Sequence, residues 1–412
     1  MERYEKYKPS GIEWIVKIPE HWEVKRLKRF AKICNGQDHK SVYDLDGKYP
    51  IMGSGGEFGR ANSFLHSGPS VLLGRKGTVD KPRYVDFPFW SVDTAYFTDI
   101  FSITNPRFFF YLCTTIKFDL YKYGSAVPSM NQEVLGQIEF TSPPLSEQSS
   151  IATFLDRKTA EIDQIIGNKQ KLIALYEEEK QAVINHTVTR GVNPNVYLKP
   201  SGVEWLGDIP EHWNLIKLKR VSNKITDGEH ISPTFTIEGM SFLSAKDVRD
   251  EYVQFDYDKF VNFEEGLKFR RRCNPEKGDL LIVSRGATVG RVAIVDTDEQ
   301  FCLLGSVILV KPSSTILNKF LLYSLKNKLL QDNFLLTSQS SAQQAIYLVN
   351  VAEIHLSIPL INEQQSIIIY IEKESKRLDT IIEKCKKQIE LLKEYRTTLI
   401  NEVVTGKVKV SN

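Results

Sequence analysis

The chain contains the same segment twice, and this duplication constrains its fold more than any other feature. Residues 199–213 read KPSGVEWLGDIPEHW, and residues 8–22 read KPSGIEWIVKIPEHW. When residues 8–29 are aligned with residues 199–220, 14 of 22 positions are identical. Such internal similarity indicates that one structural unit is built twice.

Two further pairs of segments extend the repeat. LLGRKGTVDK at 72–81 corresponds to LIVSRGATVGR at 281–291, and the segment that starts SPPLSEQ at 142 corresponds to SIPLINEQ at 357. The sequences between these segments differ in length and in residue choice. The chain is therefore a tandem duplication of about 200 residues, with a common frame and an individual interior in each copy.

Each copy has two parts. The first is rich in Gly, Pro, aromatic residues and short β-branched runs such as VGRVAIV, which predicts a mixed, mainly β globular domain. The second has helical periodicity, with Ser146 and Asn362 as the expected N-caps and Gly191 and Gly406 just past the ends. We expect four segments: a globular domain over 1–145, a long helix over 146–191, a second globular domain over 192–360, and a second helix with a tail over 361–412.

Apolar residues at three- and four-residue steps predict coiled-coil pairing of both helices. The pattern lapses at one shared position, occupied by Lys169 and by Cys385. The predicted seam consists of Leu155, Ile162, Ile166, Ile173, Tyr176 and Val183 in the first helix and Ile371, Leu378, Ile382, Ile389, Leu392, Leu399 and Val403 in the second.

A helix of about 43 residues is roughly 60 Å long and needs a partner for its apolar stripe. The helix of the other copy is the simplest partner, and the globular domain between the two helices favours antiparallel packing. The predicted fold class is therefore α+β, with two pseudo-two-fold-related, mainly β domains separated by two long antiparallel coiled-coil helices. In the alternative, each helix binds a separate partner.

Composition and cysteine usage favour a cytoplasmic protein with no membrane partner. The chain is 42% apolar and 25% charged, and apolar runs such as QSIIIYIE at 365–372 are far shorter than the ~20 residues that span a bilayer. The start, MERYEKYKPSG, lacks the apolar core of a signal peptide. The five scattered cysteines have no metal-ligand spacing and predict neither disulfides nor structural zinc.

The sequence contains none of the catalytic motifs that we sought. There is no Walker A loop, no D/N-P-P-Y/F pocket of amino-methyltransferases and no serine nucleophile elbow. The seven histidines form no HxH or HxxxH pair, and we interpret His21 and His212 of the PEHW segments as structural. We therefore expect no catalytic residue, no metal site and no cofactor bound by this chain.

The order and duplication of these segments resemble the specificity subunits of type I restriction–modification systems. The residues that carry the resemblance are SGVEWLGDIPEHW, DGEHISP at 227–233, the SRGATVG turn and the PLxxEQ helix starts. The resemblance covers essentially the whole chain. It implies that each globular domain is a target recognition domain that reads one half of a bipartite, asymmetric site in double-stranded DNA.

The resemblance also implies partners. The paired helices would fix the gap between the half-sites and dock two methyltransferase subunits, which bind S-adenosylmethionine and methylate adenine N6. Restriction endonuclease/translocase subunits, which use ATP and Mg²⁺, would cleave unmethylated DNA. A rod of roughly 60 Å is long enough for half-sites separated by a DNA turn of about 34–36 Å.

The turn repeated at 75–78 and 285–291 is the first candidate for DNA contact. Glycine lets the backbone approach a phosphate, and arginine grips a phosphate or pairs with guanine O6 and N7. A surface hairpin with an incidental arginine is the alternative. The candidate residues are Arg75, Lys76, Gly77, Thr78, Arg285, Gly286, Thr288, Gly290 and Arg291.

Polar loops before the helices are the second candidate, because Asn and Gln side chains pair bidentately with adenine. They contribute Ser125, Asn131, Gln132, Gln339, Ser340, Gln343 and Gln344. The third candidate is the DGEH segment, with Asp227, Gly228 and His230; the first copy has Asn35, Gly36 and Asp38 in the matching place.

Two alternatives to a DNA-recognition subunit remain open: a structural coiled-coil adaptor that binds other proteins, and a self-contained nuclease or methyltransferase. The repeated PSGxEWxxxIPEHW segment is predicted to do no chemistry. Its Trp and Pro residues would instead join the start of each domain to a helix end. The C-terminus should then lie near residues 8–22, as the end of the first helix adjoins residues 199–213.

Overall fold

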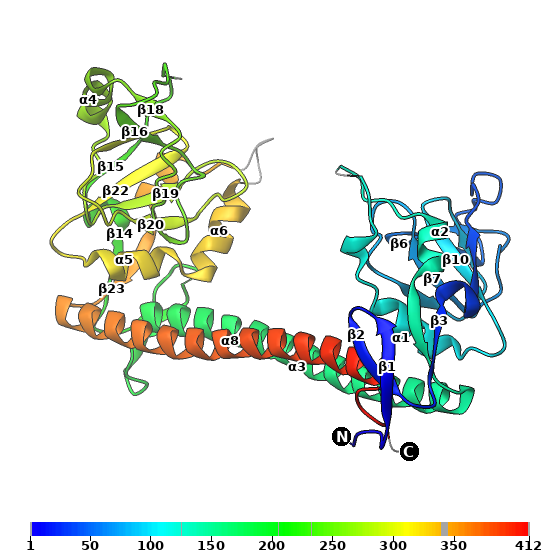
Figure 1. Cartoon of the computed structure of the whole chain (residues 1–412). Helices are drawn as coiled ribbons and strands as arrows, with labels where there is room; N and C mark the ends of the chain where they lie inside the picture. The colour runs from blue at the N-terminus through cyan, green and yellow to red at the C-terminus, as the bar shows by residue number, and fades with distance from the viewer. Residues whose placement is uncertain (1, 125, 205, 232, 339–344, 411–412) are drawn as a thin grey trace. The chain divides into compact units, whose positions relative to one another are not determined.

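The computed structural model describes residues 2–124, 126–204, 206–231, 233–338 and 345–410. It divides into two compact units, each assembled from both halves of the sequence. Unit 1 is Met1–Gln170 with Lys386–Asn412, and unit 2 is Lys171–Cys385. Figure 1 shows the elements by label and colour. Among the described residues, no helix combines the length and apolar character needed to cross a membrane.

Unit 1 is mainly β, as predicted. Its largest sheet has the order β4-β10-β7-β8, and a second sheet has the order β6-β5-β9. Two antiparallel pairs, β1 with β2 and β3 with β11, complete it. The elements are β1 Tyr7–Ile12, β2 Ile15–Pro19, β3 Glu23–Arg26, β4 Ala31–Asn35, β5 Tyr49–Gly53, β6 Gly56–Ala61, β7 Ser70–Gly74, β8 Arg83–Val85, β9 Trp90–Ser91, β10 Ala95–Ile100, β11 Glu139–Ser142, α1 Pro106–Thr114 and α2 Gln132–Gln137.

Unit 2 repeats this plan with additions. Its largest sheet has the order β15-β22-β19-β20-β17, beside a three-stranded sheet β18-β16-β21. The elements are β12 Leu198–Pro200, β13 Asp208–Pro210, β14 Asn214–Lys217, β15 Ser222–Asp227, β16 Met240–Leu243, β17 Glu251–Tyr252, β18 Phe260–Val261, β19 Leu280–Val283, β20 Val292–Ile294, β21 Phe301–Leu303, β22 Val307–Pro312, β23 His355–Ile358, α4 Phe263–Arg272, α5 Asn318–Leu325, α6 Lys328–Ser338 and α7 Leu348–Ala352.

Two long helices connect the parts of the chain: α3 at Leu145–Arg190 and α8 at Ile361–Val404. In unit 1, the start of α3 packs against the end of α8, where Leu155 shares a core with Leu399 and Val403. In unit 2, the end of α3 packs against the start of α8, where Ile184 shares a core with Ile371. The helices are therefore antiparallel within each unit, and the α+β fold class predicted from the sequence is confirmed.

The predicted seam residues all face inward to some degree. Leu155, Ile162, Ile371, Leu378, Ile382, Ile389, Leu399 and Val403 are buried, whereas Ile166, Ile173, Tyr176, Val183 and Leu392 are half-buried. At the shared lapse, Lys169 Nζ donates to Gln388 Oε1 at 2.6 Å, and Cys385 is buried. The lysine at the lapse therefore forms a hydrogen bond across the seam to the partner helix.

The predicted N-caps are wrong by two residues. Both helices begin earlier, because Gln148 N donates to Pro144 O and Gln364 N donates to Leu360 O. Ser146 and Asn362 consequently lie inside the first turn. Pro144, directly before α3, is tolerated because the amide of a residue at the start of a helix has no partner within the helix.

The predicted glycine C-caps are confirmed. Gly191 has φ 78° and donates to Thr187 O at 3.0 Å, and Gly406 has φ 74° and donates to Val403 O at 3.2 Å. A Cβ on Gly406 would lie only 2.4 Å from Pro19 Cδ. Glycine at this position therefore provides both the left-handed conformation and the space for the PEHW segment.

The Glu of the Glu-Gln pair in PPLSEQ (143–148) and in PLINEQ (359–364) joins the PEHW segment to the long helix. Trp22 is fully buried and donates from Nε1 to Glu147 Oε2 at 3.0 Å, and His21 Nε2 lies 2.5 Å from Glu147 Oε1. Unit 2 has the same arrangement, with Trp213 Nε1 3.1 Å from Glu363 Oε1 and a matching histidine contact. The prediction that the repeated segment packs at a helix end is confirmed.

The chain ends also lie where the repeat predicts. Lys409 N donates to Glu2 O at 2.8 Å, and the Tyr7 hydroxyl donates to Lys407 O at 3.3 Å. Figure 1 shows the two termini side by side beside β1 and β2. The tail after α8 therefore adjoins the first PEHW segment.

The Gln of each Glu-Gln pair is a buried connector between the globular domain and the helix. Gln148 Nε2 donates to Pro143 O at 3.0 Å and to Ile103 O at 3.4 Å, and its Oε1 accepts from Asn105 N at 2.8 Å. Gln364 makes the equivalent three bonds in unit 2. Because the amide is buried, each lost bond leaves a backbone group without a partner.

We predict that Gln148→Ala destabilises the chain by about 2–4 kcal/mol, because buried donors and acceptors become unsatisfied. Chemical denaturation followed by circular dichroism measures this loss. Gln365→Ala, at an exposed glutamine of α8, is the matched control and should shift stability by less than about 0.5 kcal/mol. Equal denaturation midpoints for the two variants would contradict the connector role.

Candidate nucleic-acid interface

The first candidate turn connects β7 and β8 and is held by the backbone around it. Arg75 N and Lys76 N both donate to Thr94 O, at 2.9 and 3.1 Å. Gly77 has φ 81°, and its amide donates to Pro128 O at 2.9 Å. Only glycine adopts this conformation without strain, so the turn requires it.

The turn and the following polar loop form one surface. Met130 N donates to Arg75 O at 2.9 Å, and Lys76 bridges to Ser129. The structure thus brings together two segments that the sequence separates by about 50 residues. Of the loop candidates, Ser125 lies outside the described residues.

The basic side chains of this turn are available at the surface. Arg75 is half-buried, with its guanidinium 5.9 Å from the Tyr96 ring centroid and Nη1 3.4 Å from Asp93 O. Lys76 is exposed and makes no side-chain bond within the described part of unit 1. Thr78 is half-buried beside them. An arginine that is oriented by an aromatic ring is suited to paired donation to an acceptor.

Asn131 and Gln132 already have local partners. Asn131 Oδ1 caps α2 by accepting from Glu133 N at 2.7 Å, and Gln132 Nε2 donates to Ile33 O at 2.8 Å. Both side chains therefore help to hold the loop in place next to the turn. Their contact with adenine stays a prediction, since these bonds would have to be exchanged for bonds to the base.

The equivalent turn of unit 2 lies between β19 and β20. Arg285 and Gly286 are exposed, Thr288 is half-buried, and Gly286 has φ 100°. Arg285 bridges to Ala345, and Ile346 N donates to Ser284 O at 2.8 Å. The segment that follows the second polar loop therefore pairs with the turn, whereas the loop candidates Gln339, Ser340, Gln343 and Gln344 lie outside the described residues.

Arg291 has a different environment from Arg285. Its Nη1 donates to Val248 O at 3.2 Å. The preceding residue, Gly290, has φ 86° and accepts from Gln331 Nε2 at 2.9 Å. These bonds fasten the base of the turn to the domain, so Arg285 is the better placed of the two arginines to reach a ligand.

A shallow hollow adjoins Arg285. It measures about 590 Å³ and is lined by small and apolar residues, Ser244, Ala245, Gly286, Ala287, Leu304 and Ser306. A guanidinium beside a small apolar surface matches the mixture of acceptors and methyl groups along base-pair edges in the major groove.

The DGEH segment is a packed junction. Gly228 approaches the backbone so closely that a Cβ would lie 2.1 Å from Leu303 O, and Gly36 of unit 1 has the same relation, 2.0 Å, to Val92 O. The glycines therefore permit strand packing in both copies. Asn35 is exposed, and Asp38 accepts from Lys40 N at 3.1 Å.

In unit 2, the buried Asp227 connects this segment to α4. His230 Nε2 lies 2.8 Å from Asp227 Oδ2, and Arg272 at the end of α4 pairs with Asp227 Oδ1. One carboxylate therefore orders both groups, an arrangement that the sequence spacing did not reveal.

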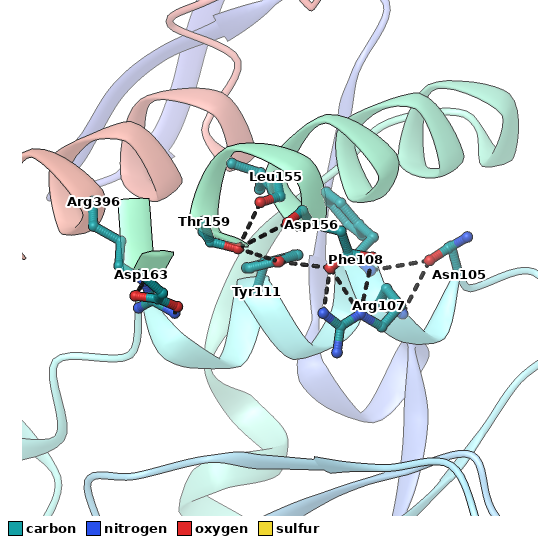
Figure 2. Close-up of polar contacts among 9 residues, drawn as sticks. All are labelled: Asn105, Arg107, Phe108, Tyr111, Leu155, Asp156, Thr159, Asp163 and Arg396. Atoms are coloured by element: carbon teal, nitrogen blue, oxygen red, sulfur yellow. Dashed lines mark hydrogen bonds and ion pairs between the residues drawn. The ribbon is translucent and has the colours of Figure 1, made fainter. Parts of the chain in front are cut away.

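A polar cluster fixes the first globular domain to α3 (Figure 2). Arg107 on α1 contacts Asp156 on α3 through both Nε, at 2.9 and 3.1 Å, and Nη2. The Tyr111 hydroxyl donates to Asp156 Oδ1 at 2.6 Å and lies 3.1 Å from Thr159 Oγ1. The guanidinium also lies 4.6 Å from the Tyr84 ring centroid. We call Arg107, Tyr111, Asp156 and Thr159 the domain joint.

Unit 2 has a simpler equivalent. Lys319 on α5 pairs with Glu372 on α8 at the positions that match Arg107 and Asp156. A second matched pair crosses the helices, Asp163 with Arg396 in unit 1 and Asp379 with Lys180 in unit 2, at 3.2 and 2.9 Å. In both units, therefore, one acid–base pair joins the globular domain to a long helix and another joins the two long helices. The pairs lie at equivalent positions, although the residues differ.

Among the described residues, no group of three His, Cys, Asp or Glu side chains has the geometry to hold a metal ion. The described cysteines are free thiols, and burial raises the pKa of both Cys273 and Cys302 to about 12. Thiols with such pKa values are poor nucleophiles at neutral pH.

The domain joint predicts a loss of stability in alkali. Burial, and next the hydrogen bond to Asp156, raise the pKa of Tyr111 to about 12, above the ordinary value of about 10. The protonated phenol therefore stabilises the folded state below pH ~10, and this contribution, on the order of 2–3 kcal/mol, disappears as the pH rises to ~12. Near-ultraviolet absorbance and denaturation across this range measure both effects.

Tyr111→Phe should lose correspondingly less stability between pH ~10 and ~12, because it has no phenol to ionise. Tyr197→Phe, at a residue that is 84% exposed, should behave as the unsubstituted chain. If Tyr111→Phe and the unsubstituted chain declined in parallel, the joint would not depend on the phenol proton.

Comparison with known proteins agrees with this architecture. A family model described as the type I restriction modification DNA specificity domain matches residues 19–174 and 210–391, once in each repeat. The type I restriction enzyme MjaVIII specificity subunit of Methanocaldococcus jannaschii is 24% identical, covering 96% of this chain and 95% of the relative. A putative type I restriction enzyme specificity subunit of Haemophilus influenzae is 23% identical, with 95% and 96% coverage.

Solved structures show the same fold. A chain from a structure on complex assembly and conformational transition of the type I R-M system matches with a TM-score of 0.73 and 16% identity, covering 95% of this chain and 100% of that one. The HsdS subunit of Thermoanaerobacter tengcongensis matches with a TM-score of 0.55 and 14% identity, with 95% and 98% coverage. Because the family model covers most of the chain in two matched copies, the chain belongs to the type I restriction–modification specificity subunit family.

Proposed function

We propose that the chain reads a bipartite, asymmetric DNA sequence for a type I restriction–modification complex, with one half-site for each globular domain. The observation that carries this proposal is the pair of arginine-bearing turns, each of which pairs with the segment that contains or directly follows a polar loop. One is built around Arg75 and the other around Arg285. The frame that holds the two turns is repeated, as are the arginine and threonine of each turn, whereas the loop sequences beside them differ, as two different half-sites require.

The chemistry of each surface suits base reading. Arg75 and Lys76 in unit 1 and Arg285 in unit 2 provide donors for phosphates or for guanine O6 and N7. The positive-φ glycine in each turn carries no Cβ, which lets the backbone of the turn approach a phosphate closely. Phosphate contacts fix the register of each domain, and base contacts then supply its specificity.

In the proposed complex this chain is not catalytic. The paired helices set the gap between the half-sites and dock two methyltransferase subunits, which bind S-adenosylmethionine and methylate adenine N6. Restriction endonuclease/translocase subunits, with ATP and Mg²⁺, complete the complex that cleaves unmethylated DNA.

Mapping N6-methyladenine across the genome of the source cell, with and without this gene, tests the function. Deletion should abolish methylation at one bipartite motif with a fixed unspecified gap. If the complete complex were active but methylated a continuous motif, or one with a variable gap, the assignment of one half-site to each domain would be wrong.

At the level of residues, Arg75→Ala and Arg285→Ala should each weaken binding to the target duplex by about 10- to 100-fold, the equivalent of about 1–3 kcal/mol. Binding should be measured with the methyltransferase subunits present and at fixed salt, because phosphate contacts depend on ionic strength.

The control for both is Lys17→Ala, at an exposed lysine of the β1–β2 hairpin, which should leave binding unchanged. Removing any lysine lowers the positive charge by one, so this variant accounts for non-specific electrostatics. Equal losses for all three variants would place the arginines outside the reading surface.

A further inference from the structure

The hairpin formed by β5 and β6 presents a phenylalanine at the surface of unit 1. Residues 53–60 read GSGGEFGR, so four glycines surround one aromatic residue. Phe58 is 55% exposed. A single exposed phenylalanine needs no explanation in itself, but the backbone around this one is shaped in a way that presents the ring.

A β-bulge turns Phe58 out of the hairpin. Met52 pairs with Glu57, and the next pair is Ile51 with Gly59. Phe58 is therefore the extra residue of β6 and has no partner in the ladder. A bulge re-aims the side chain of its extra residue, and bulges are frequent beside functional sites.

The ring belongs to a small aromatic surface. The His39 ring stands edge-on to the Phe58 ring, with centroids 5.3 Å apart and an interplanar angle of 89°, and the Tyr43 ring lies 6.1 Å from His39. Tyr43 is 49% exposed, and a Cβ on Gly59 would lie 3.1 Å from its Cε2. The glycine after the bulge therefore makes room for this ring. We call His39, Tyr43 and Phe58 the aromatic edge.

The aromatic edge adjoins the turn that bears Arg75. Thr94 contacts both the hairpin and the turn, since its Oγ1 accepts from Ser54 N at 3.5 Å and its carbonyl oxygen accepts from Arg75 N at 2.9 Å. A Cβ on Gly53 would lie 3.3 Å from both Thr94 Oγ1 and Phe58 Cε1. The Phe58 ring and the Arg75 turn are therefore neighbours of the same residue and form one surface.

Unit 2 has small residues where unit 1 has this hairpin. β16 corresponds to β5, because each pairs in parallel with a later strand of its own domain, β21 and β9 respectively. After β16 the chain continues with Ser244 and Ala245, which line the hollow beside Arg285. The apolar surface next to the arginine is thus a hollow in unit 2 and an exposed ring in unit 1. Surfaces that differ in this way suit two different half-sites.

We infer that Phe58 reads a thymine in the half-site of unit 1 by packing against the C5-methyl group in the major groove. The inference rests on the proposed function and adds a specificity-determining residue to its reading surface. Arginine pairs with guanine in that groove, and the thymine methyl is the apolar group that an aromatic ring contacts there. Because part of the Phe58 ring is packed against the hairpin, it suits contact along base-pair edges better than insertion between stacked bases.

Replacing thymine with uracil removes only this methyl group and therefore tests the contact directly. The proposed reaction methylates an adenine in each half-site, so each half-site contains at least one thymine. Binding is measured for duplexes of the mapped target in which each thymine is replaced in turn by deoxyuridine, with the methyltransferase subunits present and at fixed salt. For the unsubstituted chain, one replacement in the half-site of unit 1 should weaken binding about three- to tenfold.

Phe58→Ala should weaken binding to the thymine duplex and should no longer distinguish it from the uracil duplex, because the methyl group has lost its contact. Phe101→Ala is the matched control. Phe101 is also an exposed phenylalanine, at 40%, but it follows the end of β10 that is opposite to Thr94. This variant should keep the full discrimination, and thermal unfolding checks that both variants retain the fold.

Two results would overturn the inference and leave the proposed function intact. In one, Phe58→Ala discriminates between the duplexes as strongly as the unsubstituted chain does. In the other, the unsubstituted chain tolerates uracil at every position, a result that does not depend on the folding of any variant. If the unsubstituted chain with its partners did not bind the target duplex at all, the proposed function would fail and the inference with it.

Discussion

The rest of the structure depends on the hydrogen bonds that a glutamate carboxylate accepts at the start of each long helix. Glu147 and Glu363 each accept a hydrogen bond from a fully buried tryptophan and contact a histidine of the PEHW segment. The adjacent glutamines connect the same helix turn to the globular domain. Since a buried indole N–H must be paired, this arrangement fixes where each domain begins relative to its helix.

This junction explains the unequal divergence of the two copies. A change in the frame would leave a buried donor or acceptor without a partner, whereas a change at the rim of a turn only alters a surface. Arg75 and Arg285 lie on such rims, and the segments next to them differ in sequence. The fold therefore allows the loops beside the turns to vary on a support that does not.

Much of the fold was predictable because it depends on periodicity and repetition. The heptad pattern identified both helices and their seam, and the paired glycines identified their ends. The helix starts were misplaced because Ser146 and Asn362 resemble N-caps, whereas the helices begin where Pro144 O and Leu360 O accept their first backbone hydrogen bonds. The preference of serine and asparagine for N-cap positions was overridden at both helix starts by the side-chain hydrogen bonds of Gln148 and Gln364.

The candidate site was predictable only in part. The turns were visible because the arginine and glycine recur, but their contact with the polar loops depends on long-range backbone pairing. The domain joint was missed because Arg107 and Asp156 are distant in sequence and are replaced by Lys319 and Glu372 in the second copy, so identity gave no signal. Only the charge is the same at each of these positions, basic on the short helix and acidic on the long helix. The structure was therefore needed to show the pairing.

We propose that a common frame holds two interchangeable recognition domains. The most direct test of this proposal replaces residues 214–358 with residues 23–142, so that both positions carry the first domain between intact PEHW junctions and helices. Mapping N6-methyladenine in cells that contain this chimaera should show a symmetric motif, with the first half-site in both positions and inverted. A folded chimaera that still methylated the original asymmetric motif would contradict the claim.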